Sequence, residues 1–70
     1  MWREISKEKP VEDGLYCVAE FDGKRLVSYS LNFCVVDGVL RLNGGWCDRI
    51  NITHWMPYSE LREMLEKNLP

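Results

Sequence analysis

The chain has 70 residues, of which 46% are hydrophobic and 29% charged, and its formal net charge is −2. A chain of this length forms a single domain, residues 1–70, and its composition is typical of a globular protein rather than of a disordered or membrane-embedded one. Positive and negative residues alternate along it, which disfavours nucleic acid as a partner because a basic stripe for the phosphate backbone is missing.

The first segment, residues 1–14, is predicted to be an extended arm that ends in a turn. Pro10 opposes helix around it, and Glu12, Asp13 and Gly14 are residue types of tight turns. The N-terminus has charges where a signal peptide would need an apolar core, and the longest apolar run is too short for a membrane span. We therefore expect a cytoplasmic protein with reduced thiols.

Two Asp-Gly dipeptides predict two β-hairpins within residues 15–57. Asp22-Gly23 lies between the β-prone runs 15–21 and 24–31, and Asp37-Gly38 lies between 32–36 and 39–42. Two-residue turns would pair Phe21 with Lys24, Glu20 with Arg25, Val18 with Val27, Tyr16 with Tyr29, Val35 with Leu40 and Phe33 with Leu42.

Odd-numbered positions from Val27 to Val35 are apolar, whereas Ser28, Ser30 and Asn32 alternate with them. Such a period of two indicates a sheet with one buried face. Residues 43–45 break the pattern and predict a loop, and a short strand is expected to resume at 52–55.

From Ser59 the hydrophobic period becomes helical. Ser59 can serve as the N-cap, and Leu61, Met64 and Leu65 fall on one stripe. We expect a helix over residues 59–68, within the C-terminal segment 58–70, packed on one face of the sheet. The predicted fold class is α+β, with a small twisted antiparallel sheet of three to five strands and one C-terminal α-helix.

Three cysteines and the single histidine suggest a zinc site, formed by Cys17, Cys34, Cys47 and His54. Structural zinc ligands usually come in close pairs, yet the nearest two here are seven residues apart, which disfavours this site. A thiol-based site would use Cys47, with His54 as base and Asp48 as orienting group. Buried thiols and a histidine bonded at a sheet edge are the simpler interpretation, so we expect no cofactor and no enzyme.

Large rings in or beside irregular segments are the candidate interaction residues, since Trp and Tyr supply much of the binding energy at protein interfaces. They are Trp2, Trp46, His54, Trp55 and Tyr58. For each ring, burial in the small core is the alternative. The rings could also stack on bases in a nucleic-acid accessory protein, although such platforms normally lie in a basic groove.

Trp2, Pro10, Gly14, Trp46 and the closing segment Ile52–Pro57 together resemble a family of small domains of unknown function that is widespread in tailed bacteriophages and prophages. The likeness covers most of residues 2–57, and Thr53-His54-Trp55-Met56-Pro57 is its most specific part.

Two positions depart from this family: Arg3 stands where members commonly have Ile, and a Ser59-capped helix replaces a proline-rich end. The resemblance implies a phage or prophage origin, a setting inside the bacterial host cell and a clasp that joins the first and last segments. It implies no established activity. The sequence thus predicts a non-catalytic interaction module that modulates a host or phage protein, and it leaves open whether the chain forms a homo-oligomer.

Overall fold

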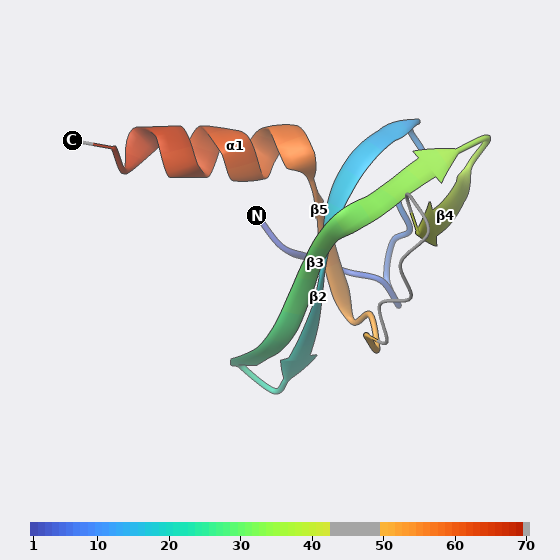
Figure 1. Ribbon diagram of the computed structural model, residues 1–70. Coiled ribbons are helices and arrows are strands. Elements are labelled where there is room, and N and C mark those ends of the chain that lie inside the picture. Colours follow the sequence, from blue (N-terminus) through green and yellow to red (C-terminus); the bar gives the residue numbers. More distant parts are fainter. Residues whose placement is uncertain (43–49, 70) are drawn as a thin grey trace.

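The computed structural model describes residues 1–42 and 50–69. A five-stranded antiparallel sheet and one C-terminal helix confirm the predicted α+β class (Figure 1). The elements are β1 (Arg3–Glu4), β2 (Gly14–Asp22), β3 (Arg25–Val36), β4 (Val39–Leu42), β5 (His54–Pro57) and α1 (Tyr58–Lys67). Within these two ranges, no helix has the length and apolar character that a membrane crossing would require.

The strand order is β1-β5-β2-β3-β4, so the last strand lies between the first two. Arg3 of β1 is opposite Trp55 of β5, and Glu4 is opposite His54. On its other side β5 pairs with β2 from Tyr16 to Ala19. The closing segment of the chain is therefore an interior strand of the sheet, hydrogen-bonded to neighbours on both sides.

The second predicted hairpin is confirmed in its register: Val35 pairs with Leu40, and Phe33 pairs with Leu42. Both turn residues have left-handed backbone conformations, with φ of 53° at Asp37 and 78° at Gly38. Asp-Gly suits such a turn because glycine takes positive φ without a steric penalty and aspartate tolerates it better than most residues. The twist of this turn also matches that of the two strands it joins.

The register predicted for the first hairpin is wrong. Asp22 pairs with Arg25, which makes Gly23 and Lys24 the turn residues, and Gly23, with φ of 61°, takes the first turn position. The register shifts further at two irregularities, opposite Glu20/Phe21 and Tyr16/Val18 of β2, and at each of them β3 has one residue more than β2. The observed pairs are Phe21 with Leu26, Glu20 with Ser28, Val18 with Ser30 and Tyr16 with Phe33.

These irregularities also change which residues of β3 are buried. Phe33 and Val35 are buried as predicted, but Val27, Tyr29 and Leu31 are exposed. Ser30, and not the predicted Val27, lies opposite Val18, so Ser30 takes the buried position. The uniform buried face expected from the period of two is therefore limited to the C-terminal third of the strand.

The main core lies on one face of the sheet, where five buried residues from three strands pack together. They are Tyr16, Val18, Phe33, Val35 and Trp55. Half-buried apolar residues from the arm, β4 and the segment before β5 pack against them: Ile5, Leu40, Leu42, Ile50 and Ile52. The N-terminal arm thus supplies part of the cover that a small sheet needs.

Helix α1 begins one residue earlier than predicted and has Pro57 as its N-cap residue, so Ser59 is not the cap. It contacts β2 and β5, yet none of its residues is buried, and Figure 1 shows it projecting away from the sheet. The prediction that the helix packs across one sheet face is therefore wrong. Leu61 is only half-buried, while Met64 and Leu65 further along face solvent.

Candidate interaction surface

Thr53 and His54 make their polar contacts with each other and with the β2 backbone. The Phe21 amide donates to Thr53 Oγ1 at 2.9 Å, and Thr53 Oγ1 lies 2.8 Å from His54 Nδ1. The imidazole also packs edge-on against the Phe21 ring, with 4.7 Å between ring centroids. These contacts hold the half-buried histidine against the sheet.

Trp55 is a core residue, with 6% of its surface exposed. Its indole Nε1 donates to the Glu8 carbonyl at 3.0 Å, and its ring meets Tyr16 edge-on at 5.4 Å. The Arg3 guanidinium carbon lies 5.1 Å from the ring centroid, within cation–π range. Trp55 thereby joins the arm and β1 to β5.

The predicted interaction residues do not form one surface. Trp2 and His54 are half-buried, and each contacts Phe21. Trp55 is enclosed in the core, whereas Tyr58 is exposed at the start of α1. Trp46 lies outside the described residues. Of the predicted rings in the described residues, Tyr58 is therefore the one that is exposed, and Trp55 is part of the core.

The thiols show no arrangement for chemistry in the described part of the chain. Cys17 is 1% exposed, and burial raises the pKa of its thiol, which opposes thiolate formation. Cys34 is half-buried on β3, and Cys47, with Asp48, lies outside the described residues. In residues 1–42 and 50–69, no three His, Cys, Asp or Glu side chains are grouped so that they could hold a metal ion.

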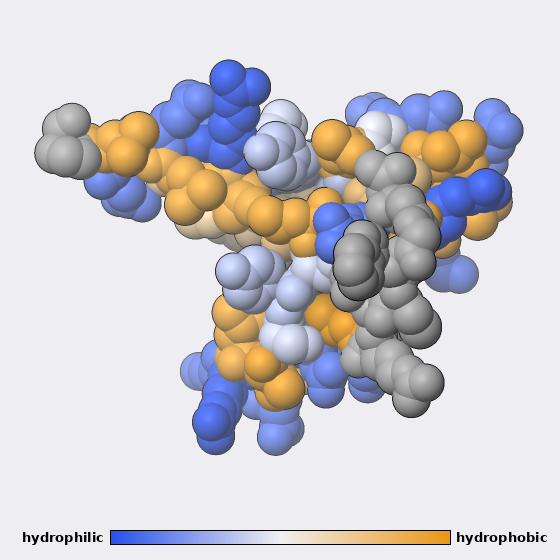
Figure 2. All heavy atoms as spheres, in the orientation of Figure 1, coloured by the Kyte–Doolittle hydropathy of each residue, from blue (hydrophilic) through white to orange (hydrophobic). Residues whose placement is uncertain are grey.

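A hydrophobic groove lies between α1 and β3 and has a volume of about 170 Å³. We call it the α1 groove. It is lined by Leu31 of β3 and by Tyr58, Leu61, Arg62, Leu65, Glu66 and Leu69 of the C-terminal segment. Figure 2 shows hydrophobic residues in a band along α1, with hydrophilic residues on the opposite side of the helix. The sequence stripe at Leu61 and Leu65 predicts an apolar side of the helix here, although as a face that packs on the sheet.

The polar rim of the α1 groove carries one residue of each charge. Arg62 Nε donates to Glu66 Oε1 at 3.0 Å, and both side chains are mostly exposed. The pair spans one turn of the helix, so it supports α1 by a few tenths of a kcal/mol at most. Because both groups remain accessible, they can also contact charges on a partner.

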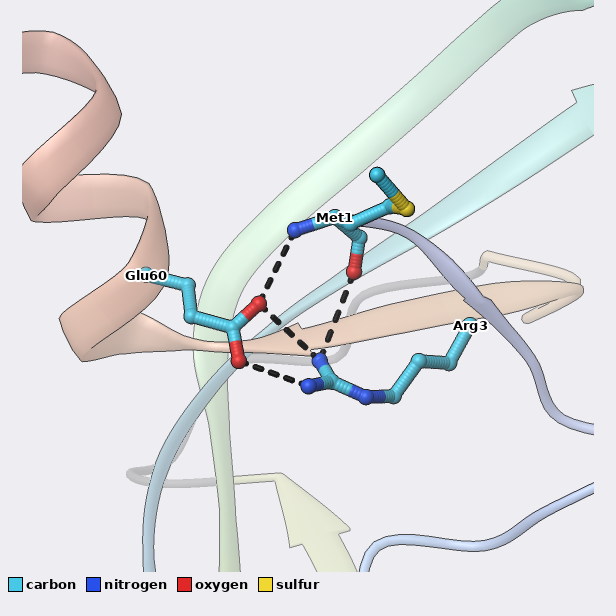
Figure 3. Close-up of polar contacts among 3 residues, drawn as sticks. All are labelled: Met1, Arg3 and Glu60. Carbon is cyan, nitrogen blue, oxygen red and sulfur yellow. Dashed lines mark hydrogen bonds and ion pairs between the residues drawn. The ribbon is translucent and has the colours of Figure 1, made fainter.

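A polar cluster joins the first turn of α1 to the start of the chain (Figure 3). Arg3 Nη2 donates to Glu60 Oε2 at 2.6 Å, Arg3 Nη1 donates to Oε1 at 3.1 Å, and the Met1 amino group lies 2.9 Å from Oε1. The hydrogen bonds from Arg3, followed by that from the Met1 amino group, lower the pKa of Glu60 to about 2. Since Arg3 also lies over Trp55, the start of the helix is tied to the core.

A comparison of the chain with models of protein families, with curated proteins and with solved structures finds no match.

Proposed function

We propose that this chain is a small non-catalytic protein-interaction module of phage or prophage origin, which binds and modulates a host or phage protein in the bacterial cytoplasm. The observation that carries the proposal is the exposed apolar side of α1. Leu65 is 60% exposed and Leu69 is 71% exposed, and both line the α1 groove.

The size and position of this surface support a binding role. A contiguous exposed apolar patch rimmed by polar residues is typical of a protein-interaction site. An isolated helix of ten residues is only marginally stable in water, and packing of its apolar face normally supplies the missing stability. A partner in the α1 groove would both remove apolar surface from water and stabilise the helix.

The contacts of the closing motif support a non-catalytic role. Thr53, His54 and Trp55 make short contacts that join strands and arm, which accounts for these residues without a reaction. The resemblance of Thr53–Pro57 to the phage and prophage family supports the proposed origin.

The test is site-specific photocrosslinking in bacterial cells that carry the protein. A photoreactive residue replaces Leu65 in the α1 groove or, as a matched control, Val11 on the arm, which is 72% exposed. We expect a protein that crosslinks from position 65 and not from position 11. Equal products from both positions would contradict the proposal.

Reconstitution with purified proteins completes this test. Leu65→Glu should weaken binding of the captured protein by about tenfold or more, as expected for an apolar anchor at an interface. Val11→Glu adds the same charge at an exposed apolar residue of the arm and should leave the affinity unchanged. Equal affinities of the two variants would show that the captured protein does not use the groove.

A further inference from the structure

We infer that the occupant of the α1 groove is α1 of a second copy of this chain, antiparallel to the first and related to it by a two-fold axis near Leu65. This inference rests on the proposed function and names the partner for the same surface. A two-fold axis makes the interface self-complementary, so each contact must occur twice.

Three apolar residues of the C-terminal segment, two in α1 and Leu69 just beyond its end, satisfy this symmetry. Leu65 lies midway between Leu61 and Leu69 in the sequence, and all three line the α1 groove. In an antiparallel pair centred on Leu65, this residue faces its own copy. Leu61 then faces Leu69 of the second copy, and the reverse contact forms at the other end.

The charged residues at the rim of the α1 groove also satisfy the two-fold symmetry. They favour the antiparallel over the parallel arrangement of the two helices. Arg62 and Glu66 lie one turn apart on the same side of the helix and line the groove. Antiparallel packing places Arg62 of each copy near Glu66 of the other. Parallel packing would instead align Arg62 with Arg62 and Glu66 with Glu66, and like charges at such positions are unfavourable.

The position of α1 in the fold leaves room for the helix of a second copy. The helix projects from the sheet in Figure 1, and the Arg3–Glu60 contact holds its first turn in place. A helix that is already oriented loses less conformational entropy on binding than a mobile segment would.

The interface is small. Ten helical residues span about 15 Å, and a stable complex usually buries about 800 Å² on each partner. The groove residues of α1 and Leu31 together offer a short contact, so we expect a weak dimer whose dissociation constant lies in the micromolar range or above.

Sedimentation equilibrium of the full chain, from micromolar to millimolar concentration, tests the dimer. We expect Leu65→Glu and Leu69→Glu each to raise the dissociation constant by about tenfold or more. Val11→Glu should leave it unchanged, and circular dichroism should show that all three variants keep the fold, since the altered side chains are exposed. A protein that stays monomeric, or a dimer that neither leucine variant weakens, would overturn the inference.

Charge reversal tests the orientation. In the variant R62E/E66R the two charges exchange places. An antiparallel homodimer of this variant therefore still places opposite charges near each other. Its homodimer should be as strong as the original one, while mixed dimers with the unaltered chain should be several-fold weaker because both rim contacts become repulsive. A mixed dimer that is stronger than both homodimers would overturn the antiparallel arrangement.

Crosslinking from position 65 separates failure of this inference from failure of the proposed function. If the chain is monomeric and crosslinks to a specific bacterial or phage protein, the proposed function as an interaction module is supported and the homodimer inference is overturned. Crosslinking to a second copy of the chain supports the inference. The absence of any specific product, with a monomeric chain, contradicts both.

Discussion

Arg3 donates two hydrogen bonds to the carboxylate of Glu60, at 2.6 Å and 3.1 Å, and so joins strand β1 to the first turn of α1. The guanidinium simultaneously lies over the Trp55 ring. A single side chain from the start of the chain therefore connects the sheet core with the helix that carries the α1 groove.

Arg3→Ala should lower the free energy of unfolding by about 1 to 2 kcal/mol, because it removes a bidentate ion pair and a cation–π contact. Chemical denaturation measures this change. Arg3→Lys keeps the charge but not the two-pronged geometry, so we expect it to recover only part of the loss. Full recovery by lysine would show that only the charge matters.

The free energy of unfolding should decrease in acid because the Glu60 carboxylate becomes protonated. Its pKa is about 2 in the folded protein, below the ordinary value of 4.5, so the ion pair stabilises the fold fully above pH 4.5. This contribution is lost as the pH falls from about 4.5 towards 2. We expect about 1 kcal/mol, since both side chains are about one third exposed and solvent screens the pair.

Denaturation of Glu60→Gln across this pH window provides the measurement. The variant should lose stability less steeply with falling pH than the unaltered chain does. Glu63→Gln removes a carboxylate from the exposed side of the same helix and should keep the original slope. Identical slopes for the unaltered chain and Glu60→Gln would contradict the role of the ion pair.

Trp55→Phe should cost about 2 kcal/mol, because it removes the hydrogen bond to the Glu8 carbonyl and part of the core ring volume. Hydrogen exchange should also become faster in residues 5–8 of the arm. Tyr29→Ala, at a side chain 62% exposed, should change stability by less than about 0.5 kcal/mol. Unaltered exchange in the arm would contradict the clasp.

Gly38→Ala should destabilise the second hairpin by about 1 kcal/mol, because φ of 78° brings an added Cβ into conflict with its own backbone. Asp37→Asn should be nearly neutral, since asparagine also tolerates a left-handed conformation. Thermal unfolding compares the two variants. Equal melting temperatures would show that the turn adjusts without cost.

Cys34 should react with a thiol reagent at neutral pH well before Cys17. Cys17 is buried and its thiol pKa is raised by that burial, whereas Cys34 is half-buried. Mass spectrometry of labelled peptides gives the two rates. Labelling of both cysteines only on global unfolding would contradict the difference in access.

Local sequence chemistry predicted much of the fold. The register at Asp37-Gly38 was predictable because two residues that accept positive φ favour one tight two-residue turn between the strands. At Asp22-Gly23 the glycine takes the first turn position instead of the second, which the dipeptide alone does not reveal.

Longer-range features were not predictable in this way. The two irregularities between β2 and β3 are not marked by any glycine or proline of β3, and with them Tyr29 pairs with Ala19 and is exposed. For the candidate site, the stripe at Leu61 and Leu65 was visible in the sequence, but periodicity cannot distinguish packing on the sheet from packing on a second molecule. The Arg3–Glu60 contact joins residues 57 positions apart, which no local pattern predicts.

The placement of β5 between β1 and β2 has a consequence for biosynthesis. Until residues 54–57 are available to pair, β1 lacks its neighbour and one edge of β2 is open, so only the hairpins β2–β3 and β3–β4 can pair. Completion of the sheet must wait until translation has passed Pro57. A chain that lacks its last strand therefore keeps unpaired strand edges, which favour association with other chains.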